Sequence, residues 1–329
     1  MNNKLKVREL STITPIEKDR PDDLFITCGS FEKRFLGSIK KLNKSLFKNL
    51  ILFKFAEPNE QREKLIKEME MVLGLDANER YFKIMCEHGN SINAILEFHE
   101  LLLEKLNINY EDVSVTIDIS TFTKDLLSHL LLFLVKYEQI KRIRCLYTSP
   151  ERYASPEEGW LSFGIKNIHF PPMGWKSWSP RKDNLLLLIL GFEELRAWTL
   201  IDKFPAEKYM LFITKPGTVP EWDNFCEKYN ERLLKRYPPH GSIPAIDPYK
   251  TFKVLEKEIE NLLPKYNIFI SPLGTKPQLV GIINLMVRKI PVNLVTTTVI
   301  QHNVPYYSSE IGKTFEFYFP IGSDRNDDG

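Results

Sequence analysis

A strand that runs into a helix is predicted most clearly by the segment Val113-Ser114-Val115-Thr116-Ile117-Asp118-Ile119-Ser120-Thr121-Phe122-Thr123-Lys124. Residues 113–119 are rich in β-branched side chains, which is typical of a buried strand. Residues 123–137 then show the apolar spacing of a helix. The same change from strand to helix recurs along most of the chain. This alternation predicts an α/β fold with mostly parallel sheets that helices cover on both faces.

The predicted elements fall into two series. In the first half we expect strands at 23–28, 50–55, 113–119 and 143–148, and helices at 60–73, 92–106 and 123–137. An apolar run at 164–170 follows without an intervening helix and predicts an antiparallel edge strand. In the second half we expect strands at 185–190, 209–214, 267–271, 292–297 and 314–319, and helices at 193–203, 221–234, 249–263 and 275–287.

The second series repeats the first closely enough to indicate an internal duplication. Phe170-Pro171-Pro172-Met173-Gly174 in the first half matches Phe319-Pro320-Ile321-Gly322 in the second, and Lys124 matches Lys276. The two lysines are 152 residues apart and the two terminal glycines are 148 apart, so the spacing is nearly constant. A looser match joins 28–34 with 190–196. We therefore expect two tandem Rossmann-like domains at 21–180 and 181–323, after a polar lead at 1–20 and before a disordered tail at 324–329.

Length and composition limit the classes of function. A chain of 329 residues with 43% hydrophobic and 27% charged residues is long enough for two globular domains. Its net charge of +2 gives no basic surface for extended duplex binding, so small anionic ligands fit better. The four cysteines form no CxxC pair, the N-terminus has no apolar signal segment, and no apolar run is long enough to span a bilayer. These features predict a cytoplasmic protein without a membrane anchor.

Two segments that carry a lysine are the main candidates for a ligand site. In open parallel sheets, ligands bind at the carboxyl ends of the strands, where helix N-termini offer free N–H groups. A cation in the first turn of a helix opposes the helix dipole, and a bound anion would explain it. Alternatively, the threonines only cap their helices and the lysines point into water. The candidate residues are Ser120, Thr121, Thr123 and Lys124 in the first segment and Ser271, Gly274, Thr275 and Lys276 in the second.

The order of strand, Gly-Thr-Lys and helix at 267–287 resembles the ligand loop of CRISPR-associated Rossmann-fold (CARF) sensor domains, which bind cyclic oligoadenylates. The paired series also resembles the SAVED sensors of cyclic-nucleotide antiviral systems, which contain two fused CARF-like units. The resemblance implies that Thr275 and Lys276, together with Thr123 and Lys124, line one nucleotide pocket between two pseudosymmetric domains. The first segment departs from the pattern, because Phe122 stands where glycine is expected.

Other candidate residues follow the first and the last core strands. Arg34 and Arg196, with Glu32 and Glu193 beside them, open the helix after the first strand of each half. This is the usual phosphate position of doubly wound folds, although no GxGxxG accompanies it and acidic residues at a helix N-terminus are common. Tyr307 follows the last core strand of the second half, where an aromatic ring could stack on a base.

Catalytic signatures are sparse. The six histidines and four cysteines show no metal-ligand spacing, and the sequence predicts no particular cofactor. Asp118 and Glu32 are the carboxylates that a nucleotide-acting hydrolase or transferase would use. Three hypotheses follow: a sensor or defence component that binds a nucleotide-type anion, an enzyme that uses one half of the chain, and a structural subunit of a multiprotein assembly or homo-oligomer.

Overall fold

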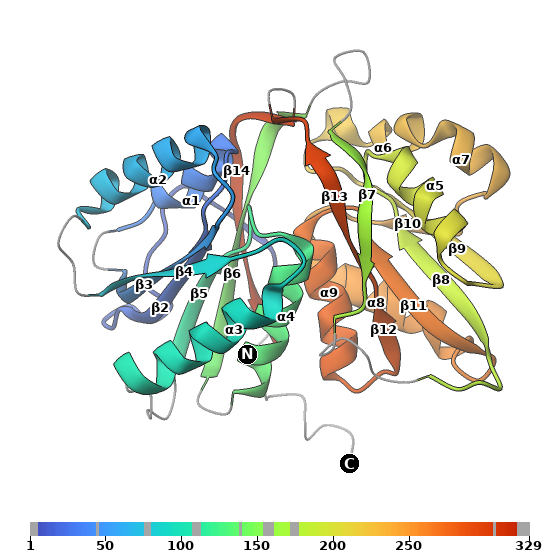
Figure 1. The fold of residues 1–329 in the computed structure, drawn as a ribbon, viewed down its shortest axis with the longest axis horizontal. Helices are drawn as coiled ribbons and strands as arrows, with labels where there is room; N and C mark the ends of the chain where they lie inside the picture. The colour runs from blue at the N-terminus through green and yellow to red at the C-terminus, as the bar shows by residue number, and fades with distance from the viewer. Residues whose placement is uncertain are drawn as a thin grey trace. The chain divides into compact units, whose positions relative to one another are not determined.

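The computed structural model describes residues 6–43, 46–75, 80–106, 113–137, 140–153, 161–171, 178–304 and 307–320. The chain forms two compact units (Figure 1). The first unit comprises Met1–Ala154 and Val304–Gly329, and the second comprises Ser155–Asn303. The chain therefore leaves the first unit once, builds the second, and returns.

The first unit contains a seven-stranded sheet in the order β1-β14-β6-β5-β2-β3-β4. The five strands β2 to β6 are parallel, whereas β14 is antiparallel to β6 and β1 is antiparallel to β14. Counted along the chain, the parallel strands have the order 3-2-1-4-5. The strands are β1 (Arg8–Leu10), β2 (Asp22–Cys28), β3 (Phe47–Phe55), β4 (Tyr81–Cys86), β5 (Val113–Asp118), β6 (Ile140–Tyr153) and β14 (Ser308–Phe319).

Helices cover both faces of this sheet, with α1 and α2 on one face and α3 and α4 on the other (Figure 1). Leu65 and Met69 of α2 pack against Phe25 and Leu50 of the sheet. On the opposite face, Phe98 of α3 contacts Phe53 at a ring-centroid distance of 5.8 Å. The helical segments are η1 (Lys33–Phe35), α1 (Leu36–Ile39), α2 (Glu60–Leu73), α3 (Ser91–Glu100), the π-helical turn η2 (Leu101–Lys105) and α4 (Lys124–Lys136).

The second unit contains a parallel five-stranded sheet in the order β10-β9-β8-β11-β12, which is again 3-2-1-4-5 along the chain. A separate antiparallel pair joins β7 to β13. The strands are β7 (Ser162–His169), β8 (Asp183–Ile189), β9 (Lys208–Thr214), β10 (Gly241–Ile243), β11 (Tyr266–Pro272), β12 (Val292–Leu294) and β13 (Thr296–His302).

The core of the second unit is formed by β8 and β11 against α5, where Leu186 and Phe269 pack with Leu200. Helix α8 shows how the sequence sets a helix start. Asp247 accepts a hydrogen bond from the backbone N–H of Lys250 (2.9 Å), and Pro248 occupies the first helical position. The helical segments are α5 (Glu194–Lys203), η4 (Pro220–Trp222), α6 (Phe225–Tyr229), α7 (Glu231–Arg236), α8 (Pro248–Glu260) and α9 (Lys276–Val287).

The prediction of an α/β fold with mostly parallel sheets is confirmed. Two strands lie in other sheets than the sequence suggested. The run at 164–170 is antiparallel as expected, but it was assigned to the domain at 21–180, whereas β7 belongs to the second unit and pairs there with β13. The last strand, assigned to the domain at 181–323, is β14 and pairs with β6 in the first unit. The matched glycines Gly174 and Gly322 and the tail at 324–329 lie outside the described residues.

Among the described helices, none is both long and apolar enough to cross a membrane.

Candidate functional site

Both lysine-bearing segments lie at the point where the strand order reverses, at the carboxyl ends of parallel strands. In the first unit this switch point lies between β2 and β5, and α4 begins there. In the second unit it lies between β8 and β11, and α9 begins there. This is where open α/β sheets bind their ligands. The predicted placement of both segments at strand ends is therefore correct.

Asp118 ends β5 and has no exposed surface. Its carboxylate accepts hydrogen bonds from the hydroxyl of Ser38 and from the hydroxyl and backbone N–H (2.9 Å) of Ser120. Ser120 Oγ accepts in turn from the backbone N–H of Thr148 (2.7 Å). Burial raises the pKa of Asp118, while the hydrogen bonds from Ser120 and Ser38 oppose that shift. Asp118 thus connects β5, α1 and β6 from inside the unit.

The other residues of the first lysine-bearing segment, 121–123, pack against neighbouring strands or cap α4, so they fill the lower part of the switch point. Thr121 Oγ1 donates to the carbonyl oxygen of Cys28 (2.7 Å), which joins the end of β5 to the end of β2. Phe122 is 1% exposed and packs on Phe53 at a ring-centroid distance of 5.8 Å. Thr123 caps α4 by accepting from the backbone N–H of Leu126 (3.3 Å). Of the candidate residues in this segment, only Thr123 and Lys124 are partly exposed.

Glu32 and Arg34 form a buried ion pair at the end of β2. Arg34 donates from Nε to Oε2 (2.8 Å) and from Nη2 to Oε1 (3.0 Å) of Glu32. The two side chains are 6% and 2% exposed. Ser308 Oγ, from the first residue of β14, donates to Glu32 Oε2 (2.7 Å). The Glu32 carboxylate therefore accepts two hydrogen bonds from the Arg34 guanidinium, which is the bidentate geometry in which arginine also binds a phosphate.

In the second lysine-bearing segment, Gly274 is required because a larger side chain would collide with Gln278. A Cβ atom on Gly274 would lie 2.0 Å from Gln278 Oε1, which accepts the backbone N–H of Thr275 (2.8 Å). Gln278 is fully buried, and its amide donates to Thr214 Oγ1 (3.1 Å). Thr275 is the N-cap of α9, and its hydroxyl donates to the carbonyl of Ala245. Thr275 and Gln278 thus form a capping box, Gly274 leaves room for the Gln278 amide, and Lys276 is the first residue of the helix.

The base of the second switch point is also closed. The backbone N–H groups of Leu273 and Gly274 both donate to the carbonyl of Ile189 (2.9 and 3.0 Å). Gly191 is required here, because a Cβ atom would lie 2.6 Å from the carbonyl oxygen of Leu273. Ser271 is buried on β11. Only the upper rim, from Gly274 to Lys276, is partly exposed.

An ion pair that matches Glu32–Arg34 lies in the second unit. Arg196 Nη1 donates to Glu193 Oε2 (2.6 Å), and each side chain is 12% exposed. Glu193 also accepts from the hydroxyl of Ser162, the first residue of β7. Arg196 Nη2 donates to Thr297 Oγ1 (2.7 Å). Both arginines predicted as anion ligands are therefore engaged by a neighbouring glutamate.

Tyr307 lies close to Glu32 and Arg34, although 273 residues separate it from Arg34 in the sequence. Its ring meets Phe31 edge-on at a centroid distance of 5.8 Å. Tyr307 and Arg34 both influence Tyr153, whose pKa burial raises well above the ordinary value. The structure therefore brings Glu32, Arg34 and Tyr307 together. Its second-half neighbour Tyr306 lies outside the described residues.

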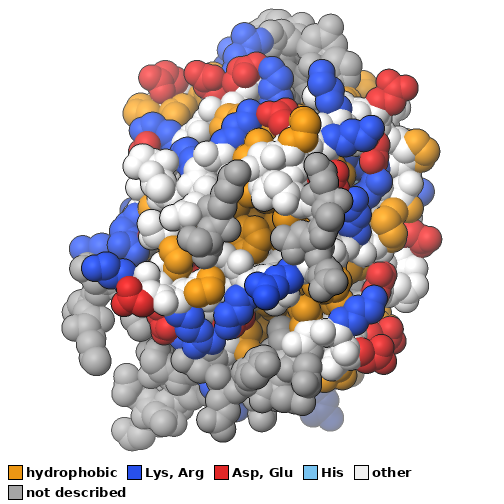
Figure 2. Space-filling model, turned by 90° about the vertical axis from the view of Figure 1, so that its left-hand side faces the viewer, with side chains coloured by type: hydrophobic (Ala, Val, Ile, Leu, Met, Phe, Trp, Pro, Cys, Tyr) orange, Lys and Arg blue, Asp and Glu red, His pale blue; other side chains and the backbone are white. Residues whose placement is uncertain are grey.

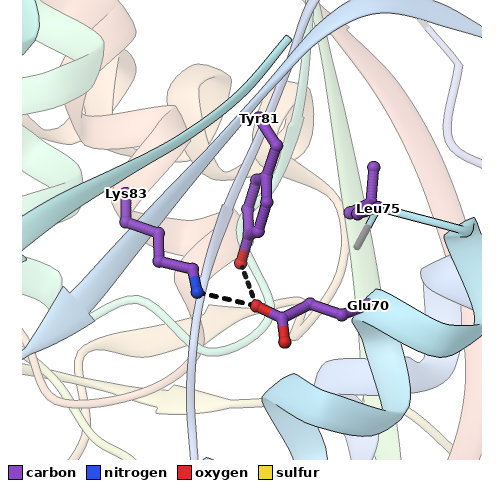
Figure 3. A pocket seen from close by; sticks show the side chains of 4 residues that line it. All are labelled: Glu70, Leu75, Tyr81 and Lys83. Carbon is purple, nitrogen blue, oxygen red and sulfur yellow. Dashed lines mark hydrogen bonds and ion pairs between the residues drawn. The ribbon is translucent and has the colours of Figure 1, made fainter. Parts of the chain in front are cut away.

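A hollow that the sequence did not reveal lies beside β4. It has a volume of about 450 Å³ and is lined by Glu70, Leu75, Tyr81 and Lys83 (Figure 3). Glu70 Oε1 accepts from both Tyr81 (2.9 Å) and Lys83 (2.8 Å). The sequence analysis did not predict strand β4 (Tyr81–Cys86). None of the predicted ligand residues lines this hollow. Because its polar groups satisfy one another, we assign no ligand to it.

Basic and acidic side chains alternate on the surface of the first unit, and many of them form ion pairs. Lys40 with Glu68 and Lys54 with Glu63 each approach to 2.8 Å. Figure 2 shows basic and acidic side chains interspersed on the left-hand side of Figure 1, with a row of basic ones across its lower part. Within the described ranges, no group of His, Cys, Asp and Glu side chains could hold a metal ion.

Comparisons with known proteins add little to this geometry. No protein-family model matches the sequence, and no curated protein matches it. One solved structure, the cytoplasmic domain of a prokaryotic cation chloride cotransporter, aligns over 87% of this chain and 99% of that chain. The two are 11% identical with a TM-score of 0.25, which is too low to support an argument about fold or function.

Proposed function

We propose that this protein binds a nucleotide-type anionic ligand, such as a cyclic oligonucleotide, at the carboxyl ends of its parallel strands. One observation carries the proposal: both sheets have the strand order 3-2-1-4-5, and at both switch points a helix begins with a lysine, Lys124 or Lys276. The resemblance to CARF and SAVED sensors motivates the further proposal that the protein is a sensor or component of an antiviral defence system.

Burial decides which residues are suitable ligand contacts. Ser120, Thr121 and Ser271 are buried. The hydroxyl of Thr123 already accepts a hydrogen bond from the backbone of α4, and that of Thr275 donates one to the carbonyl of Ala245. The contacts that we propose are the ammonium groups of Lys124 and Lys276 and the first-turn backbone N–H groups of α4 and α9 that the caps do not use. A lysine beside these N–H groups favours phosphate over a neutral ligand, because both the helix dipole and the charge attract an anion.

We also propose that the two units descend from one duplicated module. The shared strand order supports this, and so does the matching serine, glutamate and arginine at the end of β2 and of β8. In the first unit the antiparallel strand β14 comes last, whereas in the second unit its counterpart β7 comes first. Two fused copies that exchanged their last strands would have this arrangement.

The enzyme hypothesis receives less support. Asp118 has no exposed surface and three hydrogen-bond donors, and Glu32 is held by Arg34 and Ser308. A carboxylate in either environment has no path to a substrate in this conformation.

A thermal-shift screen against nucleotides, cyclic dinucleotides and cyclic oligoadenylates tests the proposal. A ligand that binds only the folded protein raises the unfolding midpoint by mass action. We expect one phosphate-bearing class to raise it, and the rise to disappear in Lys124→Ala or Lys276→Ala. Lys136→Ala and Lys257→Ala are matched controls, because these lysines lie in the last turns of α4 and α8. A rise that survives loss of both first-turn lysines would refute this site.

An assembly subunit is the second candidate function. Helix α3 exposes Ile92 and Leu96 by 42% and 55%, and Leu103 in the following turn is 48% exposed. Their spacing places them along one side of the helical segment. Light scattering after size exclusion tests this candidate: a species larger than one chain that Leu96→Glu converts to a monomer would support it.

A further inference from the structure

Two half-buried aromatic rings, those of Phe192 and Tyr229, lie beside the switch point of the second unit, and we call them the aromatic platform. Phe192 belongs to the loop after β8, and Tyr229 is the last residue of α6. The ring centroids are 5.3 Å apart and the ring planes differ by 29°, so the rings are stacked. Phe192 also packs against the core of the second unit. The platform therefore rests on the core and remains partly exposed to solvent.

Hydrogen bonds from neighbouring residues hold the two rings in place. Asn230 follows Tyr229 and is 1% exposed. Its side-chain amide donates to the carbonyl oxygens of Gly191 (2.8 Å) and Cys226 (2.7 Å). Because Gly191 directly precedes Phe192, these bonds tie the loop after β8 to the end of α6. The rings thus keep their spacing without a ligand, which lowers the entropic cost of stacking a third ring on them.

The platform borders the proposed anion contacts at the start of α9. A Cβ atom on Gly191 would lie 3.3 Å from the Cα atom of Gly274, so the loops after β8 and β11 touch at these two glycines. Phe192 is one residue from this point along the chain, and Lys276 is two residues from it. Since consecutive Cα atoms are 3.8 Å apart, the Cα atoms of Phe192 and Lys276 are at most about 16 Å apart. This separation suits a nucleotide, in which a sugar joins the phosphate to the base.

The first unit has a related pair of rings with a different geometry. Phe31 stands in the loop after β2, as Phe192 stands in the loop after β8. Its ring meets that of Tyr307 edge-on, with an interplanar angle of 80°. The two rings of the platform are much closer to parallel, so a third ring can continue their stack. Only the pair in the second unit therefore has the arrangement that receives a flat base.

We propose that the aromatic platform binds the base of a nucleotide whose phosphate lies at Lys276. This role of the platform rests on the proposed function, and it adds the part of the ligand that a lysine and a helix N-terminus do not recognise. Every base has a flat π-surface, so stacking strengthens binding by roughly fivefold or more without selecting one base. The second unit is thus specific for nucleotides over phosphates that carry no base.

Ligand-observed NMR titrations of the full chain with AMP and with ribose 5-phosphate test this role, because the two probes share a sugar and a phosphate and only AMP carries a base. The wild type should bind AMP at least about fivefold more tightly than ribose 5-phosphate. Tyr229→Leu should remove this difference by weakening AMP alone, whereas Tyr229→Phe keeps a ring and should preserve it. Lys276→Ala should weaken the binding of both probes alike, because it removes a phosphate contact.

Tyr237→Leu is the matched control. Tyr237 is also half-buried in the second unit, but its ring contacts Trp198 and Tyr209, and Tyr209 lies at the amino end of β9. The control should leave both affinities unchanged, and circular dichroism checks that each variant is folded. Equal affinity of the wild type for the two probes, or the same loss of AMP binding in Tyr229→Leu and Tyr237→Leu, would overturn the platform and leave the lysine site standing. Binding of neither probe would refute the proposed function and the platform together.

Discussion

Glu32→Gln should destabilise the first unit strongly, although it changes only one atom of the side chain. Burial lowers the pKa of Arg34, but Glu32 together with the nearby Tyr153 and Tyr147 raises it overall, so the guanidinium stays charged. The variant leaves that guanidinium at 2% exposure without the carboxylate that is paired with it. The glutamine oxygen can still accept one of the two hydrogen bonds at 2.8 and 3.0 Å.

Removing one partner of a buried ion pair costs about 3–5 kcal/mol. Because one hydrogen bond survives, we expect a loss near the lower end, about 3 kcal/mol in the free energy of unfolding. Arg34→Met should cost a similar amount at neutral pH, but its remaining carboxyl can take up a proton. An unpaired buried carboxyl has a raised pKa, so the loss in Arg34→Met should shrink as the pH falls, whereas the loss in Glu32→Gln should not.

Urea unfolding followed by circular dichroism measures these losses. The double variant Glu32→Gln, Arg34→Met should lose less than the sum of the single variants, because it buries no lone charge. Glu68→Gln is the control: its partner Lys40 is 48% exposed, so it should cost under about 1 kcal/mol. A loss in Glu32→Gln as small as that of Glu68→Gln would refute the buried ion pair.

Three further predictions concern single residues. Gly274→Ala should lower the thermal midpoint by the equivalent of about 1–3 kcal/mol, because the new Cβ would displace Gln278; an unchanged midpoint would contradict the capping-box account. Burial raises the pKa of Cys86 and of Cys226 to about 12, and all four cysteines are buried, so a thiol reagent near neutral pH should label the protein only after denaturation. Rapid labelling of the native protein would count against that burial. Burial also raises the pKa of Asp118, so the folded state holds its proton more tightly than the unfolded state. The stability of the wild type relative to Asp118→Asn should therefore fall as the pH rises through the folded-state pKa, and a difference that stays constant with pH in urea unfolding would contradict this.

The parallel sheets were predictable because their signals are local. A buried strand such as Val113–Asp118 is a short β-branched run, and a helix such as Lys124–Lys136 repeats its apolar residues at helical spacing. The short edge strand β10, with three residues, has no such signal. The partners of β7 and β14 were not predictable, because an alternating strand fits any open sheet edge and long-range pairing decides between edges.

The candidate site was predictable in position but not in environment. The sequence placed Lys124 and Lys276 at the starts of helices after strands, and the structure agrees. Asp118 accepts a hydrogen bond from Ser38, 80 residues earlier in the chain, and Glu32 accepts one from Ser308, 276 residues later. No local pattern records such contacts, so a polar residue at a strand end suggested a ligand contact where the structure has an internal hydrogen bond.

Titration calorimetry of the wild type and of the Lys124→Ala, Lys276→Ala double variant tests the central claim most directly. The titrant is the phosphate-bearing ligand that raises the unfolding midpoint most. The account predicts binding to the wild type and at least about a tenfold weaker affinity in the double variant, because each lysine contributes a charge-assisted contact. Equal affinity in both proteins, or no binding by any nucleotide or cyclic oligonucleotide, would contradict it.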